Sequence, residues 1–227
     1  MIREQESLQL SRQLPRSCGS CQASHATIVG SAMSSPLNDA IAGLCSGDLS
    51  ARESAAAAIF RAGEASAAHA LKSWMSDPEL SALLLGPQPE TTVGLAVQRE
   101  TFSKIRAAHS VSRLAEVPSE QDAEEFELRF SNGASLDILT SRAPGGDGAI
   151  ARFLGKFGEG VQQVEFRCTS VDRATEILKE KFGVAAVYPE TRPGADGTRV
   201  NFFLMPVPGA GKVLIELFEP AGKPSKK

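Results

Sequence analysis

The residues best suited to chemistry are polar side chains that alternate with apolar ones near the end of the chain. The strand expected over residues 161–168 (VQQVEFRC) has a polar face with an amide, an acid and a base, namely Gln163, Glu165 and Arg167. The strand expected over residues 212–219 (KVLIELFE) places one acid, Glu216, opposite a face of Val213, Ile215 and Leu217. Carboxylates in a pocket can transfer protons or bind a cation. The two stretches therefore predict a sheet curved around a polar pocket.

A hairpin earlier in the chain repeats this pattern. Residues 124–130 (EEFELRF) and 134–140 (ASLDILT) are joined by Ser131, Asn132 and Gly133, a typical hairpin turn. The first strand should place its three aromatic and aliphatic residues on one face and three charged residues on the other, namely Glu125, Glu127 and Arg129. On the second strand Asp137 lies opposite the apolar face. More acids are therefore expected in the pocket.

These elements belong to an order that occurs twice, strand–helix–strand–strand–strand, over residues 91–146 and 158–220. The first copy is predicted as strand 91–97, helix 99–110 and strands 113–117, 124–130 and 134–140. The second copy is predicted as strand 161–168, helix 170–183 and strands 185–189, 198–205 and 212–219, after a helix-like run at 146–157. The expected fold class is α+β, with paired βαβββ modules forming a curved mixed sheet around a cleft.

Polar positions fall at matching places in the two copies. Asp137 and Glu216 lie on the last strand of each copy, and Thr92 and Gln163 lie at the start of each first strand. Such matching supports an internal duplication more strongly than any single motif does.

The residues before the first copy predict a small helical segment, 33–88, that serves as a docking or capping element. Ser34 or Ser35, followed by Pro36, marks the start of one helix. Asp48 or Ser50 marks the start of a second helix, which we expect to end at Gly63. A third helix should cover 64–75 and end before Asp77 and Pro78, and residues 86–90 (GPQPE) read as a linker.

The two ends of the chain are expected to be a disordered extension, 1–32, and a flexible tail, 221–227. Cys18 and Cys21 form a CxxC pair in the extension, with only His25 nearby to complete a zinc site, so two free cysteines are the simpler interpretation. Natural translation from Met33 is a further hypothesis.

Composition limits the partners. The net charge of −3 gives no electrostatic basis for binding nucleic acid or an anionic membrane. The chain lacks an apolar run of membrane-spanning length and a secretory signal. We therefore expect a cytoplasmic protein with a small-molecule ligand, no nucleic-acid or membrane partner, and a homodimer as a candidate assembly.

Five segments resemble the vicinal oxygen chelate superfamily, which has the glyoxalase and bleomycin-resistance fold, and within it methylmalonyl-CoA epimerase. The segments are IARFLGKFGEGVQQVEFRCTSVDRATEILKEKFG, RPGADGTRVNFF and KVLIELFEP, with VGLAV and LDILTSRAP in the first copy. The resemblance covers about residues 91–220 and none of the helical segment. It implies paired modules around a cavity, but this fold hosts several unrelated activities.

The resemblance also implies site residues. Metal-dependent members hold a divalent cation through a His on each first strand and a Glu or Gln on each last strand. The matching residues of this chain are Thr92, Asp137, Gln163 and Glu216, so both histidines are replaced. An all-oxygen set favours Mg, Mn or Ca over Zn. The alternative is that no cofactor binds and that Gln163 is a buried amide hydrogen-bonded to Glu216 or Asp137.

For catalysis, the resemblance points to Glu216 and to Glu127 as an acid/base pair on opposite walls of the pocket. Gln163, Glu165, Arg167 and Arg129 are the candidate substrate-binding residues. In a competing interpretation Glu127, Glu165, Arg129 and Arg167 only form cross-strand ion pairs.

Three functions follow. The first is an isomerase (epimerase) or lyase acting on a carbon acid next to a carbonyl, for example in an acyl-CoA. The second is a metal-free protein that binds a small molecule, and the third is a scaffold or regulator with a catalytically degenerate domain.

Overall fold

A computed structural model describes residues 35–209 and 211–222 of the protein, all within one unit of the fold. The expectations for the extension 1–32, for Met33 and for the Cys18–Cys21 pair lie outside these residues. So do all but the first two residues of the expected tail. No helix among the described residues is long and apolar enough to cross a membrane.

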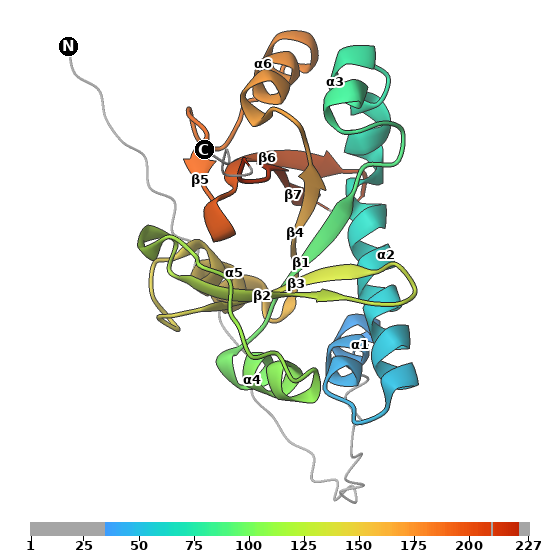
Figure 1. Ribbon diagram of the computed structural model, residues 1–227, viewed down its shortest axis with the longest axis vertical. Helices are drawn as coiled ribbons and strands as arrows, with labels where there is room; N and C mark the ends of the chain where they lie inside the picture. Colours follow the sequence, from blue (N-terminus) through green and yellow to red (C-terminus); the bar gives the residue numbers. More distant parts are fainter. Residues whose placement is uncertain (1–34, 210, 223–227) are drawn as a thin grey trace, which may run out of the picture. The chain divides into compact units, whose positions relative to one another are not determined.

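A curved seven-stranded sheet forms the centre of the fold, with the strand order β2-β3-β1-β4-β7-β6-β5 (Figure 1). Its strands are β1 (Thr91–Ala96), β2 (Ala123–Arg129), β3 (Ser135–Ser141), β4 (Gly160–Arg167), β5 (Arg192–Pro193), β6 (Arg199–Val207) and β7 (Gly211–Glu219). All the strand-like stretches that carry candidate site residues are therefore strands.

Two modules make up this sheet. In the first, β1 pairs in parallel with β3, which pairs antiparallel with β2. In the second, β4 pairs in parallel with β7, which pairs antiparallel with β6. The modules meet where β1 and β4 pair antiparallel. Helix α4 (Arg99–Ala108) follows the first strand of one module and α6 (Val171–Phe182) that of the other. The predicted α+β class and paired modules are confirmed.

The second strand of each module was predicted wrongly. Residues 113–117 form no strand, and a single hydrogen bond joins the Ala115 amide to the Glu125 carbonyl of β2 over 2.9 Å. Residues 185–189 contribute only an isolated bridge between Ala186 and Phe203. Both stretches are short. Pro118 follows the first and Pro189 is the last residue of the second, and proline lacks the N–H that a continued ladder needs.

The helical segment contains α1 (Pro36–Leu44), α2 (Leu49–Trp74) and α3 (Pro78–Leu83). The Ser35 hydroxyl accepts a hydrogen bond from the Asn38 amide, and the Asp48 carboxylate accepts from the amides of Ser50 and Ala51. Asp77 caps α3 in the same way. These caps confirm the predicted starts of the first two helices.

The predicted helix end at Gly63 and the separate helix predicted over 64–75 are wrong, because α2 is one helix of 26 residues, Leu49–Trp74, that includes Gly63. Gly63 lies against the sheet, where a β-carbon would be 2.5 Å from one γ-methyl group of Val93. The glycine therefore allows close approach of the helix to β1 rather than ending the helix.

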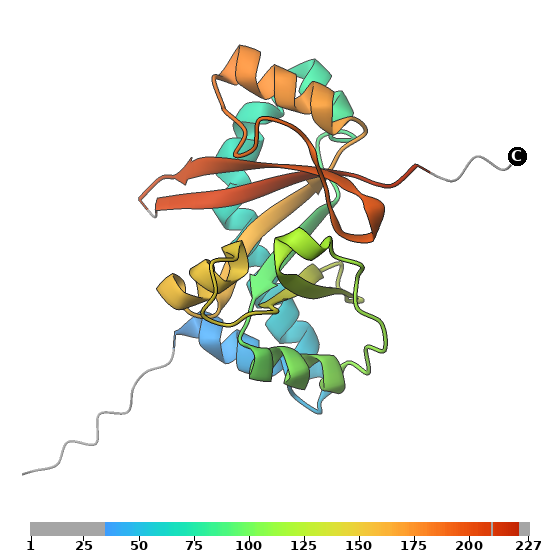
Figure 2. The same cartoon turned by 90° about the vertical axis from the view of Figure 1, so that its left-hand side faces the viewer.

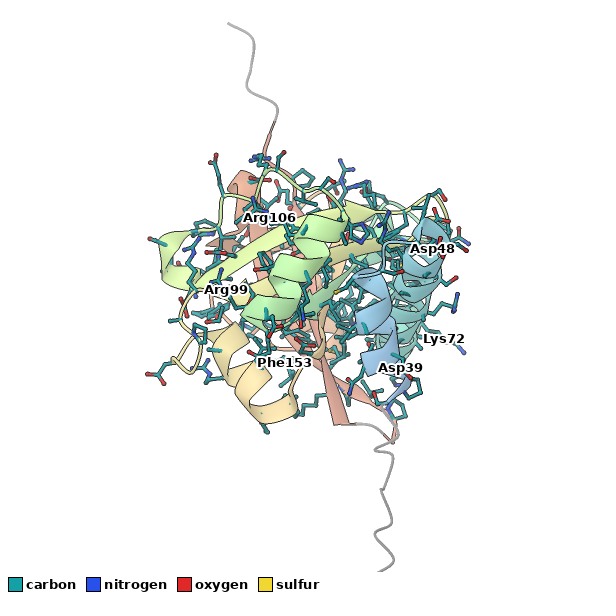
Figure 3. The ribbon with its side chains drawn as sticks, turned by 90° about the horizontal axis from the view of Figure 1, so that it is seen from below. Asp39, Asp48, Lys72, Arg99, Arg106 and Phe153 are labelled. Carbon is teal, nitrogen blue, oxygen red and sulfur yellow. The ribbon has the colours of Figure 1, made fainter. Side chains whose placement is uncertain are left out.

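The two faces of the sheet differ. The apolar face packs on the helical segment and on α4 and α6, through Val93, Leu95, Ile138, Val164 and Ile215 among others. Turning the molecule by 90° shows α1–α3 beside the strands (Figure 2). On the opposite face, helix α5 (Ala149–Phe157) packs through Ile150 and Leu154 on Ala96, Ala123 and Leu139. Figure 3 shows α5, marked by Phe153, with α4 and α1 seen from below. The rest of this second face carries the candidate site residues and is called the polar face below.

Candidate active site

Strand pairing brings four carboxylates of the polar face together at the junction of the modules. Asp137 lies opposite Gly94 of β1, which lies opposite Gln163 of β4. Glu165 lies opposite Glu216 of β7. Directly paired side chains in a sheet have β-carbons about 5 Å apart. Together with Glu125 of β2, these residues form the carboxylate cluster: Glu125, Asp137, Glu165 and Glu216.

The amide of Gln163 links two of these carboxylates. Its Nε2 atom donates to Glu216 Oε2 over 2.7 Å and to Glu165 Oε1 over 3.0 Å. Gln163 and Glu165 are only 7% and 9% exposed. The expected hydrogen bond between Gln163 and Glu216 is therefore present, and the second partner is Glu165 rather than Asp137.

Gly94 provides the room for this arrangement. A β-carbon on Gly94 would lie 2.5 Å from Gln163 Cγ and 3.2 Å from Glu165 Oε1. Because contacts under 3.0 Å force atoms to move, any side chain at position 94 would displace the amide. The glycine is thus a structural part of the cluster.

Burial and mutual repulsion favour protonation of the cluster. Burial, followed by the charge of Glu165, raises the pKa of Glu125 to about 7. Burial raises the pKa of Glu165 to about 7 as well, although the hydrogen bond from Gln163 opposes this. The pKa values of Asp137 and Glu216 are raised well above normal by burial and by the neighbouring carboxylates. At neutral pH the cluster therefore contains both protonated and ionised groups.

The other candidate residues lie at the rim of the polar face. Glu127 is exposed, pairs with Arg129 at 2.9 Å and accepts a hydrogen bond from the Ser135 hydroxyl. Glu90 joins the two arginines, at 2.9 Å from Arg167 and 3.6 Å from Arg129. The predicted cross-strand ion pairs among these four residues are therefore wrong. Glu127 pairs with Arg129 along the same strand, both arginines pair with Glu90, and Glu165 accepts a hydrogen bond from Gln163.

Sequence reasoning assigned no role to Glu125 or Glu90. Alternation placed Glu125 and Glu127 on the same face, which is correct, and left their depth open. In the structure Glu125 pairs with Leu139, which packs under α5, whereas Glu127 pairs with Asp137 nearer the hairpin end. Glu125 therefore lies beside a residue covered by α5, whereas Glu127 does not.

The predicted metal set does not form a suitable coordination site. The Thr92 hydroxyl donates to the Ser135 hydroxyl at the rim, over 3.3 Å. Gln163 presents its amide nitrogen, which has no free lone pair for a cation, to both carboxylates. Within residues 35–209 and 211–222, no three His, Cys, Asp or Glu side chains are arranged to hold a metal ion. As arranged, these residues do not fit the divalent cation that the resemblance implies.

Two surface hollows lie away from the cluster. One of about 450 Å³ lies over α4 and is lined by Arg99, Arg106 and Glu124, among others. The other, of about 500 Å³, lies between α2 and the strand residues Thr91 and Phe166. Arg99 donates to Glu124 and to the Ser141 carbonyl, so its charge is used within the fold.

Comparison with known proteins gave matches to solved structures only; no family model and no curated protein matches the chain. Methylmalonyl-CoA epimerase from Mycobacterium tuberculosis is 32% identical, with 58% of this chain and 87% of that chain covered and a TM-score of 0.48. A Streptomyces coelicolor methylmalonyl-CoA epimerase variant, in complex with 2-nitronate-propionyl-CoA, is 30% identical over 58% and 96% of the chains, with a TM-score of 0.46. A hypothetical protein from Bacillus halodurans C-125 is 24% identical over 58% and 94%, with a TM-score of 0.48.

The sheet topology and the sequence identity agree. Two modules with parallel first and last strands are joined through their first strands, and the identity to two epimerases extends over most of each of them. The chain belongs to the vicinal oxygen chelate superfamily, where its likeness is to methylmalonyl-CoA epimerases.

Proposed function

We propose that the protein exchanges a proton at the carbon next to a carbonyl group, as an isomerase of the epimerase type. The observation that carries this proposal is the carboxylate cluster, in which Glu125 and Asp137 come from one module and Glu165 and Glu216 from the other. Carboxyl groups that approach a carbon acid from two sides can remove a proton from one face and return it to the other.

The protonation states suit this chemistry. An ionised carboxylate of the cluster would accept the proton, and a protonated carboxyl group on the other module would supply one. A carboxylic acid kept neutral by its surroundings can also donate a hydrogen bond to the oxygen of an enolate. The raised pKa values of Asp137 and Glu216 favour that neutral form.

The proposal keeps Glu216 as an acid/base residue and gives the role on the first module to Glu125 instead of Glu127. Glu125 has electrostatic contact with Glu165 and lies in the cluster, whereas Glu127 is exposed and paired with Arg129. Gln163 and Glu165 are proposed to contact the carbonyl end of the substrate. Arg129 and Arg167, at the rim, are proposed to contact a more distant acidic part of it.

A small acyl thioester is the proposed substrate class. The S. coelicolor epimerase structure was solved with 2-nitronate-propionyl-CoA, which makes this compound the first probe to use. The assay panel consists of two thioesters with a hydrogen on the reacting carbon, methylmalonyl-CoA and 2-methylbutyryl-CoA. The first has a free carboxylate attached to that carbon and the second does not.

Exchange of the α-hydrogen for deuterium, followed by NMR in D2O, tests the proposal. The full chain should exchange at least one thioester of the panel faster than the enzyme-free solution. Glu125→Gln should reduce the rate by roughly 10²–10⁴-fold, the usual contribution of a general acid or base. Glu127→Gln, a neighbouring acid on the same strand, is the matched control and should stay within about fivefold of the unmodified protein.

Equal losses in the two variants would contradict the assignment of Glu125. No exchange of either thioester, with no binding of 2-nitronate-propionyl-CoA, would contradict the proposed function.

A metal-free binding protein is the second candidate, and one observation favours it. The Gln163 amide occupies an oxygen of both Glu165 and Glu216, so these groups are hydrogen-bonded before any ligand arrives. Calorimetry that detects thioester binding while NMR detects no exchange would support this alternative.

A further inference from the structure

Gln163 lies where a cation would have to lie to bind both Glu165 and Glu216. Its Nε2 atom is 2.7 Å from Glu216 Oε2 and 3.0 Å from Glu165 Oε1, and Glu165 and Glu216 are directly opposite each other on neighbouring strands. The two N–H groups of an amide can satisfy two carboxylate oxygens. A buried acid and a partly buried one are therefore joined by a neutral donor from the protein itself.

The surrounding residues hold the amide in this position. Gln163 is 7% exposed, and the absence of a side chain at Gly94 leaves the space that its Cγ atom fills. Thr92, the other residue at a first-strand position, donates to Ser135, and Ser135 donates to Glu127 over 2.9 Å. The Thr92 hydroxyl is thus part of the hydrogen-bond network at the rim.

We propose that Gln163 takes the structural place of a divalent cation in this protein. Its amide bridges Glu165 and Glu216, and the site assembles without a metal ion. The proposal rests on the proposed function for the identity of the site, but it concerns how the carboxylates are held together. It makes position 163 the residue that decides whether a metal ion binds.

Metal binding to the full chain tests the proposal without any turnover. Mn²⁺ is the probe, because loss of its free-ion EPR signal reports binding directly, and isothermal titration with Co²⁺ provides a second measurement. The unmodified protein, first freed of metal with EDTA and then separated from the EDTA, should bind neither ion stoichiometrically when the ion is added. Gln163→His, which introduces an imidazole beside Glu165 and Glu216, should bind one ion at least about tenfold more tightly than the unmodified protein does.

The bridge itself is tested by stability. Gln163→Leu removes both hydrogen bonds and should lower the melting temperature clearly. Gln162→Leu is the matched control, since the Gln162 side chain has a buried Oε1 atom without a hydrogen-bond partner among the described residues. That substitution should leave the melting temperature unchanged or raise it.

Stoichiometric binding of Mn²⁺ to the unmodified protein, lost in Glu216→Gln, would overturn the proposal. So would equal melting temperatures of Gln163→Leu and the unmodified protein. If Gln163→His does not fold, these two measurements still decide. Mn²⁺ binding and melting temperature can both be measured on a protein that shows no deuterium exchange. Failure of the proposed function is therefore distinguishable from failure of this inference.

Discussion

Gly94 limits what the cluster tolerates, because its missing side chain leaves room for Gln163. Gly94→Ala would place a β-carbon 2.5 Å from Gln163 Cγ and 3.1 Å from Leu139 Cδ1. We expect a loss of about 1–3 kcal/mol in the free energy of unfolding, typical of overpacking, together with loss of deuterium exchange. Urea denaturation and the exchange assay measure the two effects.

Gly160→Ala is the control for this substitution. Gly160 lies in β4 and pairs with Ala96 of β1, and a β-carbon there would make an ordinary contact of 3.7 Å with Leu37. A similar destabilisation by both alanines would mean that strand glycines in general, rather than the space for Gln163, determine the effect.

The raised pKa of Glu165 predicts how stability depends on pH. Its pKa is about 7 in the folded chain and 4.5 for an ordinary glutamate, so the folded state binds more protons between these values. The contribution of Glu165 to stability should therefore fall as pH rises from about 4.5 to 7 and stay constant above that range. At 1.36 kcal/mol per pKa unit, the loss attributable to Glu165 is about 3 kcal/mol.

Urea denaturation at pH 5.5 and 8 measures this loss in the unmodified protein and in Glu165→Gln, which should show a weaker pH dependence. Glu120→Gln, which changes an exposed acid on another element, should behave like the unmodified protein. An identical pH dependence in Glu165→Gln would show that Glu165 does not titrate as a buried acid.

At the scale of elements, α2 depends on a glycine that sequence patterns read as a helix end. An alanine usually stabilises a helix relative to glycine by about 1 kcal/mol. At position 63 the β-carbon would lie 2.5 and 2.6 Å from the two γ-methyl groups of Val93, so the helix would have to move off β1. We expect Gly63→Ala to lower the free energy of unfolding by roughly 1–3 kcal/mol.

Gly155→Ala serves as the comparison for helix glycines. Gly155 lies in α5 with open space around the position of a β-carbon, so alanine there should raise the free energy of unfolding. Stabilisation by both substitutions in chemical denaturation would show that the contact with Val93 is easily relieved.

Local patterns predicted which strands exist and which way their side chains point. Alternation in β2, β4 and β7 placed the acids Glu125, Glu127, Glu165 and Glu216 on the correct face, because a period of two is a property of the strand itself. The helix starts at Ser35 and Asp48 were also local, since a cap involves only the next three residues.

Features that depend on distant contacts could not be predicted in this way. Leu139, the strand partner of Glu125, is buried under α5, which follows Glu125 by more than twenty residues, and Gly63 of α2 packs against Val93. The position of the Gln163 amide between two acids depends on the register of β4 with β7 and on Gly94. The spacing of residues along the chain does not indicate which of these distant residues will be in contact.

At the scale of the whole molecule, α2 joins the helical segment to both modules. Its first half packs through Ala56 and Ile59 in the same apolar cluster as Val93, Leu95 and Ile138. Its second half packs through Ala70 and Trp74 in a cluster with Val164, Phe203 and Ile215. One helix therefore covers the apolar face of both modules, as the capping interpretation of residues 33–88 requires.

This arrangement bears on the scaffold hypothesis. A segment that served only to bind a partner would leave its apolar side chains free for that partner. Instead Ile41, Leu44, Trp74 and Leu80 are at most 3% exposed within the described residues. Their burial contributes to the cores of the modules themselves, at about 1.5–3 kcal/mol for each large side chain.

The protein should consequently unfold as one cooperative unit. Trp74, the single tryptophan of the chain, packs edge-to-face on Phe203 of β6, with ring centres 6.0 Å apart. Its fluorescence therefore reports the contact between α2 and the second module. Hydrogen exchange of the β3 amides, measured by mass spectrometry, reports the first module. Both probes should give the same free energy of unfolding in urea, since α2 connects the two cores. If the fluorescence change occurred at a lower urea concentration than the exchange of β3, the helical segment would be a separately folding part and would not cap both modules.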